Sequence, residues 1–110
     1  MDVLKRVPIK EQNPDERIHN FDEVCLGYTK DEAVLEAGRC IQCKNPRCVQ
    51  GCPVSIDIPG FINAVVREDI EEAYRIINKY SALPAICGRV CPQETQCEKN
   101  CIRGIKGEPV

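Results

Sequence analysis

The sequence predicts a small, mainly α-helical domain with long cysteine-bearing loops, and three observations support this. The 110-residue chain has the size of a single domain. Its centre carries helical periodicity and helix-capping residues, and no stretch alternates polar and apolar residues as a strand does. Eight of the nine cysteines fall into two compact groups on either side of this centre, each with a Cys-Pro step.

We expect residues 1–20 to form an extended N-terminal segment, because they mix charges with Pro8 and Pro14 and have no sustained period. The helical domain is expected to fill residues 21–110. Within it, residues 43–59 contain three prolines and one glycine and are expected to be loop. Loops suit metal ligands because several backbone N–H groups can point at one centre.

A first helix is predicted to begin after Thr29. Thr29 and Glu32 have the spacing of a capping box, in which each side chain accepts a hydrogen bond from the other residue's backbone amide. The helix would run to about Arg39 and place Cys40 at its end.

Two further helices are predicted to form an αα-hairpin between the cysteine groups. Pro59 suits the first turn of the earlier helix, and Asp69 suits the N-cap of the later one. Pro84 and Gly88 are expected to break the chain before the second group. A short helix over residues 94–100 would follow.

The cysteine spacing is typical of iron–sulfur proteins. Eight thiolates are the number that two four-iron clusters need. The bacterial two-cluster pattern is Cys-x2-Cys-x2-Cys-x3-Cys-Pro, and its last cysteine binds the other cluster. The first group keeps this order with one longer gap. The two groups are Cys40-x2-Cys43-x4-Cys48-x3-Cys52-Pro53 and Cys87-x3-Cys91-Pro92-x5-Cys97-x3-Cys101.

The same logic assigns ligands to two clusters. Cys52 would cross to the second cluster, so the first needs a distant fourth ligand, and Cys101 is the natural one. The expected ligands are Cys40, Cys43, Cys48 and Cys101 for the first cluster, and Cys52, Cys87, Cys91 and Cys97 for the second.

Zinc is the alternative cofactor, and it would make the chain a zinc-stabilised structural or interaction module. Four cysteines can close a tetrahedral zinc site, and Cys-x2-Cys is a frequent zinc knuckle. Zinc modules usually pair two such knuckles, however, and this chain has one. The remaining gaps and the Cys-Pro steps favour iron–sulfur clusters.

Composition argues against some classes of partner and indicates the cellular compartment. A formal net charge of −2 gives no reason to expect nucleic acid, and no apolar run has the length of a membrane span. The N-terminus lacks the apolar stretch of a secretory signal, so we expect a cytoplasmic protein. Thiols stay reduced in that compartment, and nine is an odd number, so metal binding is favoured over disulfides.

Two possible ligands lie outside the cysteine groups. Cys25, fifteen residues before Cys40, is expected to be a buried or half-buried thiol without a metal role. His19, the only histidine, is expected to have a surface or packing role.

Several stretches carry a resemblance to a known family: CIQCKNPRC at 40–48, GCPV at 51–54, DIPGFI at 57–62 and ICGRVCPQ at 86–93. They resemble the N-terminal iron–sulfur domain of the glutamate synthase small (beta) subunit family. The same domain opens dihydropyrimidine dehydrogenase and the large subunit of NADH-dependent ferredoxin:NADP oxidoreductase. The resemblance runs from about Arg17 to Cys101, and every cysteine gap matches.

The resemblance implies an alpha-helical ferredoxin-like domain whose loops wrap around two [4Fe-4S] clusters. In the whole proteins of this family, electrons pass from NAD(P)H through FAD to the clusters, and then to a partner subunit or a second flavin site. The implied function is electron transfer within an NAD(P)H-dependent oxidoreductase of glutamate synthase type. The domain would not be catalytic alone, and no catalytic residue is expected in it.

Two features depart from the whole proteins of the family. The chain has no Gly-x-Gly-x-x-Gly loop, so we expect a domain cut from a longer flavoprotein. FAD and NAD(P)H would bind downstream, and the partners would be that flavin domain and a second oxidoreductase subunit. Relatives supply the fourth ligand of the second cluster from a cysteine at the Cys87 position, or from a Gln or Glu that would lie beyond Val110. That ligand therefore stays open.

Overall fold

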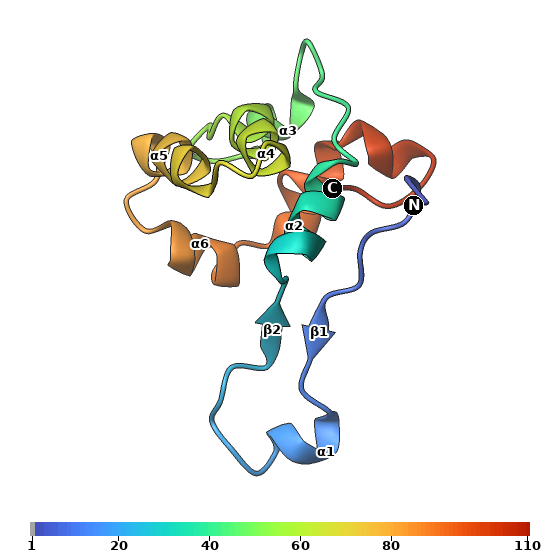
Figure 1. The fold of residues 1–110 in the computed structure, drawn as a ribbon, viewed down its shortest axis with the longest axis vertical. Helices are drawn as coiled ribbons and strands as arrows, with labels where there is room; N and C mark the ends of the chain where they lie inside the picture. The colour runs from blue at the N-terminus through green and yellow to red at the C-terminus, as the bar shows by residue number, and fades with distance from the viewer. Residues whose placement is uncertain (1) are drawn as a thin grey trace.

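Helices dominate the computed structural model, which describes residues 2–110 (Figure 1). The α-helices are α1 (Pro14–Arg17), α2 (Lys30–Ala37), α3 (Arg47–Gly51), α4 (Ile58–Val66), α5 (Ile70–Tyr80) and α6 (Pro84–Val90). The strands and 3-10 helices are β1 (Lys10–Glu11), β2 (Cys25–Gly27), η1 (Gln93–Thr95), η2 (Glu98–Asn100) and η3 (Ile102–Ile105). The predicted mainly α-helical fold class is confirmed. None of the helices in residues 2–110 has the length and apolar character that a bilayer crossing requires.

Side-chain caps fix the starts of two predicted helices. Thr29 Oγ1 accepts a hydrogen bond from the Glu32 amide at 3.2 Å, and Glu32 Oε2 accepts one from the Thr29 amide at 2.9 Å, so the capping box of α2 is confirmed. Asp69 Oδ1 accepts from the Glu72 amide at 3.1 Å and caps α5 as predicted. These caps satisfy amides that have no partner inside the helix.

The apolar core is small and lies where α4 packs against α5 and α2. Among residues 2–110, the buried apolar side chains are Ala37, Ile62, Ala64 and Ala73. Alanine removes little area from water, so this core stabilises the fold only weakly. Polar links and any bound group therefore have a large share in holding the chain together.

Residues 10–27 form an arm that projects from the helical body, with α1 at its far end (Figure 1). β1 and β2 pair antiparallel, with Lys10 opposite Gly27 and Glu11 opposite Cys25. Phe21 is fully exposed on this arm. The arm therefore adds no core, and β1 with β2 is a strand pair that the sequence pattern does not indicate.

Three sequence predictions about helices are wrong. Residues 43–59 are not all loop, because α3 begins directly after Pro46. Pro84 lies in the first turn of α6 and Gly88 lies within that helix, so neither breaks the chain. Proline is tolerated there because the first-turn amides have no helical acceptor. The single helix expected over residues 94–100 is replaced by η1 and η2.

Candidate metal centre

A cavity brings distant parts of the cysteine pattern together. It lies where the loop after α2 and helix α3 meet the segment around η2 and η3. Its walls are formed by Cys40, Ile41, Cys43, Pro46, Arg47, Cys48, Pro59, Asn100, Cys101, Ile102, Arg103 and Val110. Four cysteines therefore line one space, and they are the four that the spacing assigns to the first cluster. Their role as ligands stays a prediction.

The loop between Cys40 and Cys43 contains an unusual backbone conformation at Gln42. Gln42 has a φ of 50°, in the left-handed region that residues other than glycine seldom adopt. Its Nε2 lies 3.5 Å from Cys40 Sγ. Cys40 and Cys43, on either side of this loop, both line the cavity.

A close contact at Gly51 fixes α3 against η2. A Cβ at this position would lie 2.5 Å from both Asn100 Nδ2 and the Gln96 carbonyl oxygen, so only glycine allows this approach. Helix α3 carries Cys48 and is followed by Cys52. The same contact thus joins one ligand of each predicted set to the C-terminal cysteine segment.

Burial shifts the ionisation of the cavity thiols. The pKa of Cys48 is raised from 9.0 to about 11, chiefly by desolvation, and the charges of Cys101, Cys40 and Cys43 add to the shift. Desolvation also raises the pKa of Cys40, with smaller contributions from Cys43 and Cys101. Thiols with a raised pKa are neutral at pH 7, so a metal that binds them must displace their protons.

The second predicted set comes from three places in the fold. Its members are Cys52 after α3, Cys87 within α6, Cys91 at the end of α6, and Cys97 between η1 and η2. Desolvation, followed by the charge of Cys87, raises the pKa of Cys91, and Cys52 contributes. Desolvation raises the pKa of Cys97, again with a contribution from Cys52. Cys52 thus interacts with thiols of the second group, and its ligand role stays a prediction.

Other potential metal ligands in the described residues add little to either set. Within residues 2–110, the eight cysteines of the two sets included, no three Cys, His, Asp or Glu side chains are grouped so that they could hold a single metal ion. A four-iron cluster differs from a single ion because each cysteine binds a different iron. Cys25 is exposed, so the predicted burial of its thiol is wrong, because β2 belongs to the uncovered arm. His19 is exposed on the same arm, and its predicted surface role is confirmed.

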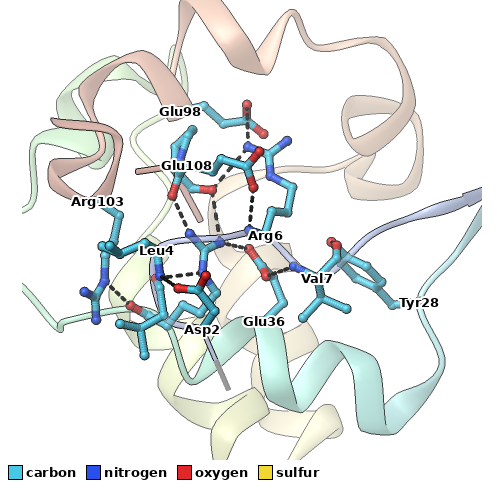
Figure 2. A network of polar contacts seen from close by, with 12 residues as sticks. Asp2, Leu4, Arg6, Val7, Tyr28, Glu36, Glu98, Arg103 and Glu108 are labelled. Carbon is cyan, nitrogen blue, oxygen red and sulfur yellow. Dashed lines mark hydrogen bonds and ion pairs between the residues drawn. The ribbon is translucent and has the colours of Figure 1, made fainter. Parts of the chain in front are cut away.

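A buried charged network lies beside the cavity, and the sequence analysis does not anticipate it (Figure 2). Arg39 has 0% exposure, and its Nη1 lies 2.5 Å from Oε1 of the buried Glu36. Glu36 Oε2 accepts a hydrogen bond from the Val7 amide at 2.8 Å. The spacing of Glu36 and Arg39 is the one signal in the sequence, and it usually marks an exposed helical ion pair.

The cavity residues fit an iron–sulfur cluster by their chemistry. Such clusters are held by cysteine thiolates, and this cavity offers four. Ile41 and Ile102 supply apolar walls, which limit water at a cluster. Arg47 and Arg103 also line the cavity, and a positively charged side chain close to thiolates offsets part of their charge.

Comparison with known proteins agrees with this chemistry. Residues 17–110 match the family described as dihydropyrimidine dehydrogenase domain II, 4Fe-4S cluster. This chain belongs to that family. The predicted resemblance is therefore confirmed, and so is the iron–sulfur character of the 4Fe-4S domain.

Three relatives show where such 4Fe-4S domains occur. The NADPH glutamate synthase small chain of Azospirillum brasilense is 37% identical over 91% of this chain and 20% of its own length. The NAD-dependent dihydropyrimidine dehydrogenase subunit PreT of Escherichia coli is 35% identical over 82% of this chain and 22% of its own length. The putative oxidoreductase UacF of Escherichia coli is 39% identical over 78% of this chain and 14% of its own length. The chain thus spans about a fifth or less of each relative.

Proposed function

We propose that this 4Fe-4S domain binds two clusters and relays electrons between a flavin module and a partner redox centre. A bound iron–sulfur cluster accepts and returns an electron at a potential set by its protein surroundings. The observation that carries the proposal is the cavity lined by Cys101 together with three cysteines from residues 40–48. Family membership supports the identity of the cofactor.

The proposed ligand sets interleave the two cysteine groups. Cys101 completes the first set from the C-terminal segment, and Cys52 joins the second set from the N-terminal group. Interleaving keeps both clusters close enough to exchange electrons, and Gly51 supports it by holding α3 directly against η2. The full sets are Cys40, Cys43, Cys48 and Cys101, and Cys52, Cys87, Cys91 and Cys97.

The names of the relatives support a place in a larger NAD(P)H-dependent oxidoreductase. We propose that residues 21–110 are the di-cluster domain of a longer cytoplasmic flavoprotein, preceded by the N-terminal segment 1–20. FAD and NAD(P)H would bind outside this domain, and a partner subunit or second flavin site would exchange electrons with it. In this arrangement the domain conducts electrons and carries no catalytic residue.

Anaerobic reconstitution tests the proposal. The chain is treated with ferrous salt and sulfide, desalted, and analysed for iron, acid-labile sulfide and zinc. We expect brown protein that bleaches with dithionite and contains iron and sulfide in equal amounts, about eight of each per chain. Folded protein that stays pale and redox-silent, or that takes up zinc instead, would refute the proposal. Iron and sulfide at half the expected level would refute the two-cluster count alone.

A further inference from the structure

We propose that Arg39 is the positioning residue of the first cysteine set, and that its buried guanidinium fixes Cys40 relative to Cys101 before any cluster binds. The cluster in this inference rests on the proposed function. The hydrogen bonds that fix the two cysteines are made by the polypeptide alone. The positioning role of Arg39 and the binding of a cluster can therefore be refuted independently.

The guanidinium of Arg39 binds acceptors from three separate segments. Its Nε donates to the Val3 carbonyl at 3.2 Å, and its Nη1 donates to Glu36 Oε1 and, at 3.3 Å, to the Pro109 carbonyl. Its Nη2 donates to the Glu108 carbonyl. The planar fork of arginine serves several acceptors in fixed directions, which a lysine ammonium cannot reproduce. Arg39 therefore has one orientation, set by both ends of the chain.

The backbone of Arg39 connects its fixed side chain to two of the proposed ligands. Arg39 directly precedes Cys40, and its own carbonyl accepts a hydrogen bond from Arg103 Nε at 2.7 Å. Arg103 lies two residues after Cys101 and also lines the cavity. A continuous path therefore runs from Cys40 through Arg39 and Arg103 to Cys101. It joins two ligands that are otherwise sixty-one positions apart in the sequence.

Further contacts keep the acceptors of Arg39 in place. The Arg6 amide donates to Glu108 Oε2 at 2.6 Å, and the Glu108 amide donates to the Leu4 carbonyl at 2.8 Å (Figure 2). Arg6 Nη2 lies 3.1 Å from Oε2 of Glu98 in η2. Every buried side-chain nitrogen and oxygen in residues 2–110 has a hydrogen-bond partner. A buried ion pair adds little net stability. Because every polar atom of the Glu36–Arg39 pair has a hydrogen-bond partner, the pair is better suited to fixing the positions of neighbouring residues.

The first test replaces the two arginines of the path. R39M is expected to lose about half of the iron of the reconstituted chain, together with the EPR signal that C101S also removes. R103M removes the bond to the Arg39 carbonyl together with one positive charge of the cavity lining, and we expect about tenfold faster loss of that same cluster to a chelator. R103Q can supply a single donor without the positive charge and is expected to restore most of the retention, which separates the hydrogen bond from the charge.

A matched control is available at Arg89. This arginine lies two residues before Cys91 and pairs with Glu23 at 2.6 Å, but its side chain is 61% exposed. R89M is therefore expected to keep the iron content and both EPR signals. The proposal is overturned if R39M keeps the first signal. It is also overturned if R39M and R103M both lose the two signals equally, because that pattern reports general destabilisation. If R39M does not fold, the comparison of R103M with R103Q decides, and equal loss of the cluster in both variants overturns the proposal.

A measurement without cofactor separates this inference from the proposed function. Hydrogen exchange on the metal-free chain should be faster in R103M than in the natural sequence at residues 40–43 and 101–104. Exchange in α5 should be unchanged, since no residue of this helix lines the cavity. Unchanged exchange at both cysteine segments would refute the positioning role. Failure of the natural chain to bind iron would refute only the proposed function.

Discussion

The first cysteine set is held by a buried charged network, whereas much of the second set is carried by a short helix with an exposed surface. Arg39 is fully buried next to Cys40. In α6, which holds Cys87, Ile86 is 53% exposed and Val90 is 69% exposed. An exposed ion pair between Arg89 and Glu23 links this helix to the arm.

This difference indicates that the polypeptide surrounds the two proposed ligand sets differently. By the inference above, the hydrogen bonds of Arg39 and Arg103 fix Cys40 relative to Cys101 without a ligand. Cys87 and Cys91 lie within and directly after this exposed helix, so their order depends more on the group that they bind.

Exchanging single cysteines for serine should separate the two sets with the largest effect. C101S is expected to remove about half of the iron and one EPR signal, although Cys101 lies far in sequence from the other three ligands of its set. C97S should remove the other half and the other signal. Iron analysis and EPR of anaerobically reconstituted protein measure both. Loss of the same signal in both variants would contradict the interleaved assignment.

A change at Gly51 should disturb both sets at once. In G51A the added methyl group meets Asn100 and the Gln96 carbonyl, and overpacking of this kind costs about 1–3 kcal/mol. Chemical denaturation of the reconstituted protein measures the loss. G88A in α6 is the control, because a Cβ there meets no atom within 4 Å. Replacing this helical glycine by alanine should stabilise by about 0.5–1 kcal/mol. Equal stability of G51A and the natural sequence would contradict the close contact.

The raised pKa of Cys48 predicts how the metal-free chain responds to alkaline pH. The pKa is about 11 in the fold against 9.0 for an ordinary thiol, so the folded state favours the neutral group. Its contribution to stability is full below pH 9 and is lost as the pH rises through about 11. Thermal unfolding of the metal-free chain over this interval should show a steeper fall than in C48S. Parallel curves would contradict the shift.

The smallest effect is expected at Cys25. This cysteine is exposed on the arm and lies outside both sets. C25S should therefore leave iron content, sulfide content and both EPR signals unchanged. A lower iron content would show that Cys25 takes part in a site after all.

Capping rules, which use only neighbouring residues, predicted the helix starts that are fixed by side-chain caps. The caps at Thr29 and Asp69 depend on residues three positions away, and both were correct as predicted. Proline misled the prediction at Pro46 and Pro84, because a residue that ends one helix can also begin another. Whether a proline ends a helix or begins one depends on whether the residues after it become helical. Tertiary packing decides that.

At the site, the placement of Cys101 was predicted from the sequence, whereas the burial of Arg39 was not. The ferredoxin logic paired Cys101 with the first cysteine group, and Cys101 does line their cavity. The burial of Arg39 had no such signal. Its acceptors on Val3 and Pro109 lie 36 and 70 residues away, and nothing in the sequence near Arg39 indicates them. The exposure of Cys25 was missed because small apolar thiols are usually buried.

The reach of the Arg39 contacts has a consequence for biosynthesis. A ribosome adds residues from the N-terminus onward, so Arg39 emerges long before Glu108 and Pro109, whose carbonyls it binds. Until these two residues appear, the nascent chain holds a cationic side chain without its final partners. We therefore expect the first cysteine set to close late in translation, after the α4–α5 hairpin has already formed.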